Sequence, residues 1–198
     1  MIRAVLFDLD GVVRHFDPAH VAAIERRHGL TAGSIHGAAF AGPALDAVTT
    51  GRISRAEWVS RVGDALAAPD AAAEWGAHPS EVDEEALALS DALRAGGIRT
   101  AILTNGTDTI PTELRELGID GRFDAVFNSA EIGYAKPDVR AFQHVLDTLG
   151  LAGSEVFFTD DSASKLTGAR ELGMTTHLFA GVAGLRAALH DAGVRVSP

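Results

Sequence analysis

Two aspartates close to the N-terminus, Asp8 and Asp10, follow directly on the short apolar run 5–7. The run is β-branched and aromatic, which predicts a buried strand that ends in these carboxylates. Side chains two apart on a strand share a face, so both could reach one site. Gly11 predicts a break in the strand, which would free Asp10 to turn away from Asp8. The pair could be solvated acids at a strand end, ligands for Mg²⁺, or a nucleophile with a proton donor.

Three later apolar runs also end in polar side chains. Run 98–103 is followed by Thr104 and Asn105, the loop after run 124–127 holds Lys136, and run 155–158 is followed by Asp160 and Asp161. The carboxyl ends of parallel strands lie at one edge of a sheet, so we expect these groups to meet the two aspartates. A hydroxyl, an amide and an ammonium can bind phosphoryl oxygens there. Taken singly, each cluster also fits a turn, a solvated loop or a helix N-cap.

An alternation of helices and strands must position these groups. Patterning predicts helices at 84–95, 108–117, 137–149, 163–172 and 182–192, and strands at 98–103, 124–127, 155–158 and 175–179. Such an alternation is typical of a parallel sheet with right-handed crossovers. The sequence therefore predicts an α/β fold.

Residues 14–83 interrupt this pattern. They contain no strand-like run and predict short helices, among them 18–28 and 54–66. We therefore expect an α/β core domain formed by 1–13 and 84–198, and a helical insert formed by 14–83 that leans on the core.

The composition excludes several classes of protein. The chain has 198 residues, a formal net charge of −10 and no cysteine, so disulfides and thiolate metal sites are ruled out. The negative charge argues against nucleic acid or an anionic membrane as partner. No apolar run is long enough to cross a bilayer and no signal peptide is visible, so we expect a cytoplasmic protein.

Four segments resemble, in order and spacing, the four motifs of the haloacid dehalogenase (HAD) superfamily, whose members are mostly Mg²⁺-dependent phosphatases. They are FDLDGVV at 7–13, LTNGT at 103–107, YAKPD at 134–138 and FTDDSASKLTGARELGM at 158–174. The helical insert is similar to the family's small cap of the first type, and TGRISRAEW at 50–58 resembles a cap segment of the haloacid dehalogenase/epoxide-hydrolase phosphatase branch. The resemblance implies a three-layer Rossmann-like parallel sheet with an inserted all-α cap.

The resemblance also implies roles for individual residues. Asp8 would attack phosphorus and bind Mg²⁺, and Asp10 would act as acid and base and offer Mg²⁺ its backbone carbonyl. Asp161 would be the remaining acidic metal ligand. Thr104 and the backbone of Asn105 would bind the phosphoryl group. The side chain of Lys136 would also bind the phosphoryl group and would pair with Asp8, and Asp160 would support Lys136.

The resulting hypothesis is a Mg²⁺-dependent phosphatase of a small phosphorylated metabolite, such as a sugar phosphate. The alternatives are a 2-haloacid dehalogenase that uses the same aspartate without metal, and a non-catalytic binding protein on this fold. The sequence departs from the family's pattern in two places: Arg14 and His15 stand where many relatives have an acid, and Lys165 stands where the family usually has Asp or Asn. On a helix, Lys165 would lie one turn from Asp161 and could approach it. The sequence leaves the oligomeric state open.

Overall fold

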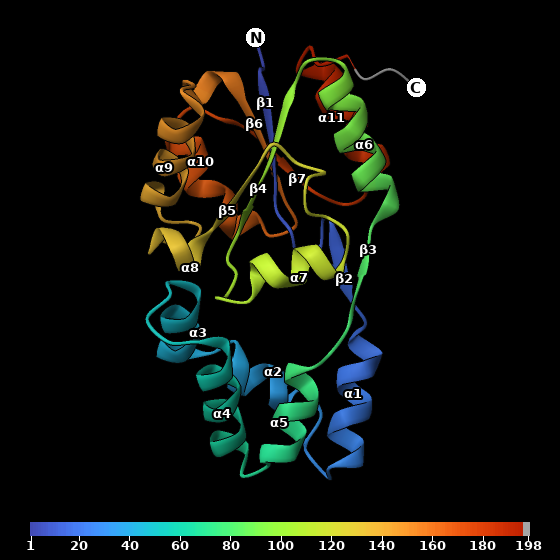
Figure 1. Cartoon of the computed structure of the whole chain (residues 1–198), viewed down its shortest axis with the longest axis vertical. Helices are drawn as coiled ribbons and strands as arrows, with labels where there is room; N and C mark the ends of the chain where they lie inside the picture. The colour runs from blue at the N-terminus through green and yellow to red at the C-terminus, as the bar shows by residue number, and fades with distance from the viewer. Residues whose placement is uncertain (196–198) are drawn as a thin grey trace.

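A five-stranded parallel sheet forms the centre of the structure, a computed structural model that describes residues 1–195 (Figure 1). Its strands are β1 (Ala4–Phe7), β4 (Arg99–Thr104), β5 (Ala125–Asn128), β6 (Val156–Asp160) and β7 (Thr175–Leu178). Their order across the sheet is β5-β4-β1-β6-β7. The central strand is paired on both sides, with Phe7 opposite Ile102 and Thr159. The predicted α/β fold is confirmed.

Helices cover both faces of this sheet (Figure 1). On one face lie α6 (Glu84–Ala95), α7 (Ile110–Glu116) and α11 (Val182–Asp191), and on the other lie α9 (Val139–Leu149) and α10 (Thr167–Glu171). Successive side chains of β1 alternate between the two cores, because strand side chains point to opposite faces. Val5 and Phe7 join one core, and Ala4 and Leu6 join the other. The result is a three-layer arrangement.

A group of short helices lies beyond the carboxyl edge of the sheet (Figure 1). It consists of α1 (Pro18–Arg27), α2 (Ser34–Ala39), α3 (Gly42–Thr49), α4 (Arg55–Leu66) and α5 (Pro69–Gly76). Ser54 caps α4 by accepting a hydrogen bond from the backbone of Glu57, as serine does at helix N-termini. Trp58 and Val62 of α4 pack with Val48 and Ala72 into a core that belongs to these helices.

The prediction that residues 14–83 contain no strand is wrong at both ends of this segment. β2 (Arg14–Phe16) and β3 (Ser80–Val82) form an antiparallel ribbon, in which Arg14 pairs with Val82 and Phe16 pairs with Ser80. Each strand has three residues, and its partner is more than sixty positions away, so neither carries a local signal that sequence patterning can detect. The ribbon carries the chain out to the helices and back to the sheet.

Two predicted helices also differ in detail. The segment 163–172 is a 3₁₀ helix, η2 (Ala163–Leu166), followed by the short α10. The predicted start of a helix at Pro137 is wrong, because Asp138 caps α9 and the helix begins at Val139.

Within residues 1–195, no helix has both the length and the apolar character that crossing a membrane requires.

Candidate active site

A buried ion-pair triad lies at the carboxyl edge of the sheet, where β1 and β6 end. Nζ of Lys136 lies 2.7 Å from Oδ1 of Asp8 and 2.7 Å from Oδ2 of Asp160. All three side chains are at most 3% exposed. Three predicted site residues from distant parts of the sequence are therefore in direct contact.

The loop that carries Lys136 is fixed by the side chain of Asn105. Its amide Nδ2 donates to the carbonyl of Lys136 at 2.9 Å, and its Oδ1 accepts from the backbone N–H of Lys136 at 2.8 Å. The sequence predicted a role only for the backbone of Asn105. The side chain adds a second role, which is to hold Lys136 in place beside Asp8.

Thr104 is the last residue of β4, the strand next to β1, and its side chain carries a hydroxyl. It is buried and has no hydrogen-bond partner among the described residues. A buried polar atom without a partner costs free energy, so such atoms mark places where a ligand is accepted. Thr104 therefore fits the predicted role of contacting a phosphoryl oxygen.

The carboxylates fit a hard metal ion. Ligand oxygens of Asp8, Asp160 and Asp161 lie within 4.8 Å of one another. Asp160 is already engaged, since Oδ2 accepts from Lys136 and Oδ1 accepts from the backbone of Ser162. Asp8 and Asp161 are therefore the carboxylates better placed to bind Mg²⁺, which prefers oxygen ligands.

Gly11 makes room for one of these carboxylates. A Cβ atom built on Gly11 would lie 2.2 Å from Oδ2 of Asp161, which is far inside van der Waals contact. The backbone of Gly11 also has φ of +87°, a conformation that favours glycine. The position therefore requires glycine for its backbone conformation and for the close approach of Asp161.

Electrostatics of the triad follow from its burial. Burial raises the pKa of Asp8 to about 7, although the Lys136 ammonium opposes the rise. Burial lowers the pKa of Lys136, but Asp8 and Asp160 outweigh this and leave its pKa raised. When ionised, the carboxylates of Asp8, Asp160 and Asp161 carry more negative charge than the Lys136 ammonium offsets. One divalent cation would neutralise that surplus.

The carboxylate of Asp10 is bound by Arg14 and is not part of the triad. β1 ends at Phe7, and the Oδ1 of Asp10 accepts from Nε of Arg14 at 2.5 Å. The strand thus ends earlier than the break predicted at Gly11, and the Asp10 carboxylate pairs with Arg14 instead of with the Lys136 ammonium that binds Asp8. The metal-site prediction for Asp10 concerns its backbone carbonyl and stays a prediction.

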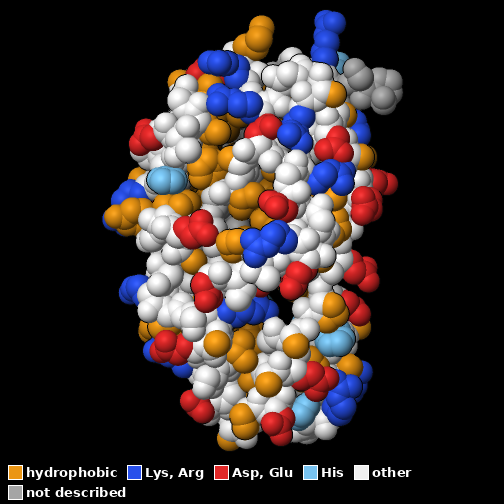
Figure 2. Space-filling view, viewed as in Figure 1, with side chains coloured by type: hydrophobic (Ala, Val, Ile, Leu, Met, Phe, Trp, Pro, Cys, Tyr) orange, Lys and Arg blue, Asp and Glu red, His pale blue; other side chains and the backbone are white. Residues whose placement is uncertain are grey.

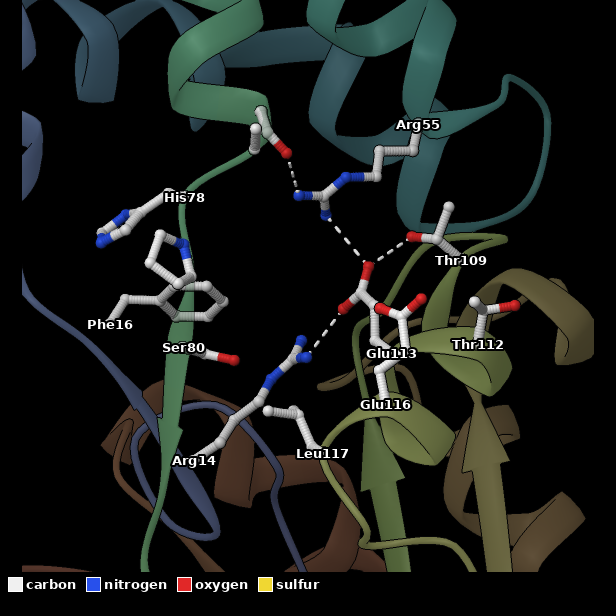
Figure 3. Close-up of a pocket in the computed structure, with 13 residues that line it drawn as sticks. Arg14, Phe16, Arg55, His78, Ser80, Thr109, Thr112, Glu113, Glu116 and Leu117 are labelled. Carbon is white, nitrogen blue, oxygen red and sulfur yellow. Dashed lines mark hydrogen bonds and ion pairs between the residues drawn. The ribbon is translucent and has the colours of Figure 1, made fainter.

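Sequence reasoning missed a bridge of charges that runs from Asp10 through Arg14 and Glu113 to Arg55 of the helical insert. Figure 3 shows the part of this bridge from Arg14 to Arg55. Arg14 also donates from Nη1 to Oε2 of Glu113 at 2.7 Å. Nη1 of Arg55, at the start of α4, lies 3.3 Å from Oε1 of the same Glu113. Arg14 departs from the family's pattern and Arg55 lies in the cap-like segment 50–58, whereas Glu113 carries no local signal.

Lys165 influences the acidic group without joining it. Burial and Asp160 raise the pKa of Asp161, and the charge of Lys165 opposes that rise. Among residues 1–195, the ion pairs within 4.0 Å include none between Lys165 and Asp161. The expected approach is therefore electrostatic and falls short of direct contact.

Figure 2 shows a local hollow on one face of the molecule, at the level where the helical insert meets the sheet. A cavity of about 210 Å³ lies between the insert and the sheet, and Asp10, Asn105 and Thr107 line it from the side of the sheet. Its walls include Trp58 and Trp75 of the insert. A substrate bound at the edge of the sheet could extend into this cavity.

The sheet and its carboxyl edge are those of a Rossmann-like enzyme with a carboxylate, an ammonium and a hydroxyl gathered at one site. The sequence matches the haloacid dehalogenase-like hydrolase family over residues 2–173. The chain belongs to this family of hydrolases, and the predicted membership is confirmed.

Individual relatives agree with this assignment. Phosphatase MT3486 of Mycobacterium tuberculosis is 30% identical over 193 residues, which cover 89% of this chain and 87% of that protein. Bifunctional epoxide hydrolase 2 of Rattus norvegicus is 34% identical over 104 residues, but these cover 49% of this chain and only 18% of that longer protein.

Solved structures share the fold. A HAD family enzyme of Bacteroides thetaiotaomicron, in complex with magnesium and inorganic phosphate, has a TM-score of 0.76 at 23% identity, with 92% of this chain and 96% of that chain covered. L-2-haloacid dehalogenase of Xanthobacter autotrophicus has a TM-score of 0.69 at 20% identity, with 100% and 85% covered. At these identities the likeness concerns the fold, which phosphatases and dehalogenases share.

Proposed function

We propose that this hydrolase is a Mg²⁺-dependent phosphatase that cleaves phosphoric monoesters of small molecules through an aspartyl-phosphate on Asp8. The observation that carries the proposal is the buried contact of Asp8 with Lys136, 2.7 Å long, together with the unpartnered hydroxyl of Thr104 at the end of the neighbouring strand β4. A carboxylate can serve as nucleophile, while an ammonium and a hydroxyl stabilise charge on the phosphoryl oxygens.

The proposed reaction has two steps. Asp8 attacks phosphorus, the bond from phosphorus to the ester oxygen breaks, and Asp10 gives its proton to the leaving oxygen. Asp10 then takes a proton from water, which attacks phosphorus and releases phosphate and Asp8. Lys136, Thr104 and the backbone of Asn105 bind the phosphoryl oxygens in both steps, and Asp160 keeps Lys136 in position.

Mg²⁺ fits the donors that surround the nucleophile. Asp8 and Asp161 would hold it with their carboxylates, and Asp10 would contribute its backbone carbonyl. The ion would supply positive charge that offsets the repulsion between the Asp8 carboxylate and an anionic phosphoryl group. The solved relative that holds magnesium and inorganic phosphate supports this choice of metal.

The position of Asp10 favours phosphatase over 2-haloacid dehalogenase chemistry. An alkoxide leaving group needs a proton, whereas a halide does not. The carboxylate of Asp10 is 45% exposed and borders the cavity, where a leaving oxygen could lie. The phosphatase relative in Mycobacterium tuberculosis supports the same choice.

A panel of phosphate esters and 2-chloropropionate, each assayed with and without Mg²⁺ in ¹⁸O-labelled water, tests the proposal. We expect Mg²⁺-dependent release of phosphate that carries one solvent oxygen, because water attacks phosphorus in the second step. Chloride release without metal, together with no phosphate release from any ester, would establish the dehalogenase alternative instead.

We further propose that residues 14–83 act as a cap over the site, with 1–13 and 84–198 as the core domain. The support is the position of helices α1 to α5 beyond the edge that carries Asp8 (Figure 1). Closure of such a segment excludes water from the reaction. Hydrogen exchange in 18–76 should slow when orthovanadate and Mg²⁺ are added together, and an unchanged pattern would count against a cap.

A further inference from the structure

The cavity between the insert and the sheet has a wall of aromatic rings. Trp58 and Trp75 meet edge to face with centroids 5.0 Å apart, and Phe40 lies 5.9 Å from Trp58 and 6.3 Å from Trp75. Val21, Leu45 and Val48 also line the cavity. This wall faces Asp10 and Asn105 on the side of the sheet, so a group attached to a bound phosphate would meet it.

Two phenylalanines at this cavity are unusually open to solvent. Phe40 is 49% exposed and Phe16 is 38% exposed, and both line the cavity. Exposed aromatic surface that borders a hollow gains free energy when an apolar group covers it. The insert thus leaves apolar surface uncovered at the place where a leaving group would lie.

The cationic side chains of the cavity are already neutralised. Arg14 is paired with Asp10 and Glu113. Arg55 is paired with Glu113 and donates to the carbonyl of Gly76, as Figure 3 shows in an adjoining pocket that both arginines also line. No other lysine or arginine in residues 1–195 lines this cavity. A second anionic group on the substrate would therefore find no free cation there, and it would face the Asp10 carboxylate.

His78 does not supply the missing charge. It lies at the wall, packed against His20 with ring centroids 4.4 Å apart. Burial and the charge of His20 lower the pKa of His78, although Asp17 opposes the effect. His78 therefore presents a neutral ring to the cavity at neutral pH.

Most polar atoms of the wall are also already satisfied. Oγ1 of Thr49 donates to the carbonyl of Leu45 at 2.8 Å, and Nε1 of Trp58 donates to the carbonyl of Ala39 at 3.1 Å. The Asn105 amide is used twice on the backbone of Lys136. A leaving group rich in hydroxyls would give up water there without gaining equivalent partners, which costs binding energy.

We infer that the phosphatase proposed above acts on monoesters whose alcohol is a compact apolar or aromatic group without a second charge. The inference rests on the proposed phosphatase function and narrows its substrate class away from sugar phosphates and phosphorylated acids. The net reaction is hydrolysis of the ester by one water to inorganic phosphate and the apolar alcohol.

A matched set of primary alkyl phosphates tests this preference with Mg²⁺ present. 2-Phenylethyl phosphate is compared with glucose 6-phosphate, glycerol 3-phosphate and phosphoglycolate, and ethyl phosphate gives the baseline. We expect kcat/KM for 2-phenylethyl phosphate to exceed that for each polar ester by about 10-fold or more. Equal or better turnover of a polar ester would overturn the inference, whereas no turnover of any ester would contradict the proposed function itself.

The variant Phe40→Ala tests whether the aromatic wall causes the preference for the apolar ester. Phe40 is half exposed, so the substitution removes little from the core. We expect the preference for 2-phenylethyl phosphate over ethyl phosphate, expressed as a ratio of kcat/KM values, to fall by about 10-fold. Val126→Ala is the control, because Val126 is 39% exposed on the edge strand β5 and should retain the wild-type ratio. An equal ratio in Phe40→Ala and wild type would overturn the assignment.

Tryptophan fluorescence gives a readout that does not depend on turnover. The chain has two tryptophans, and both line this cavity. When 2-phenylethyl phosphate is titrated into Asp8→Asn with Mg²⁺, we expect a saturable change in emission, and glycerol 3-phosphate at the same concentrations should give none. A flat response to 2-phenylethyl phosphate, or an equal response to both esters, would contradict binding of the apolar group at this wall.

Discussion

Arg14 donates from Nε to Oδ1 of Asp10 across 2.5 Å, although its own side chain is only 4% exposed. A buried guanidinium requires partners, and Glu113 supplies the second one at 2.7 Å. Asp10 is thereby held in one orientation by a residue whose other contact lies on the core helix α7. This pairing ties the proposed proton donor to the packing between sheet and insert.

Arg14→Leu should slow catalysis and weaken the fold together. It removes one of the partners of Glu113, which keeps Thr109 and Arg55, and we expect the free energy of unfolding to fall by about 1–3 kcal/mol. It also frees Asp10, so kcat should fall by about 10- to 100-fold, as with other supporting contacts. Arg61→Leu removes an exposed pair with Glu57 and should change neither quantity appreciably. A folded Arg14→Leu with the wild-type kcat would contradict the positioning role.

Glu113 should make stability depend on pH in the acid range. Burial raises the pKa of Glu113, but hydrogen bonds from Thr109 and Arg14 outweigh it and leave the pKa below its usual 4.5. A carboxyl whose pKa is lower when folded stabilises above its unfolded pKa, and loses that effect as the pH falls through the folded pKa. We therefore expect Glu113→Gln to cost about 1–3 kcal/mol at pH 7.

Chemical denaturation at several pH values measures this contribution. The difference between wild type and Glu113→Gln should shrink steadily as the pH is lowered below 4.5, because the wild-type carboxyl becomes protonated. A difference that is constant from pH 7 to pH 3 would show that the charge of Glu113 contributes nothing.

Gly11→Ala should reduce Mg²⁺ affinity beyond its effect on the backbone. The added Cβ would fall 2.2 Å from Oδ2 of Asp161 and push that carboxylate aside. We expect a loss of about 10-fold or more in Mg²⁺ affinity, measured by calorimetry. Gly97→Ala is the matched control, because Gly97 has φ of +80° and nothing within 4 Å of the built Cβ. Both variants carry a backbone cost of about 1–2 kcal/mol, so only the difference between them reports on the metal.

Lys165→Asn should strengthen Mg²⁺ binding. The charge of Lys165 opposes protonation of Asp161 and therefore also repels a cation from the same carboxylate. We expect the dissociation constant for Mg²⁺ to fall by about 2- to 10-fold, and less at high salt, since Lys165 is partly exposed. Equal dissociation constants in Lys165→Asn and wild type would show that the Lys165 ammonium lies in solvent and does not affect the metal site.

The contacts around Asp8 are the part of the site that sequence patterning could predict. Asp8, Lys136 and Asp160 each follow an apolar run, and a parallel sheet brings the ends of its strands to one edge. Their meeting at 2.7 Å therefore follows from local patterns together with one topological rule. The division into sheet and helical insert could be predicted on the same basis.

The remaining features depend on contacts between distant residues, which no local pattern in the sequence indicates. Arg14 and Glu113 are 99 positions apart, and Glu113 looks like an ordinary surface acid on its helix. Phe40, Trp58 and Trp75 come from three separate parts of the insert and would each pass for core residues. Only their arrangement in space makes an aromatic wall, so the candidate substrate pocket could not be predicted from the sequence.

The central claim is that Asp8 is the nucleophile of a Mg²⁺-dependent phosphatase, and the release of phosphate from an aryl phosphate by Asp8→Asn tests it most directly. The substitution is nearly isosteric, and Lys136 keeps Asp160 as a partner, so the fold should persist, as circular dichroism can verify. With Mg²⁺ present, we expect turnover to fall by about 1,000-fold or more, whereas the surface control Asp120→Asn should match wild type. A folded Asp8→Asn that releases phosphate at a rate within a few-fold of wild type would contradict the claim.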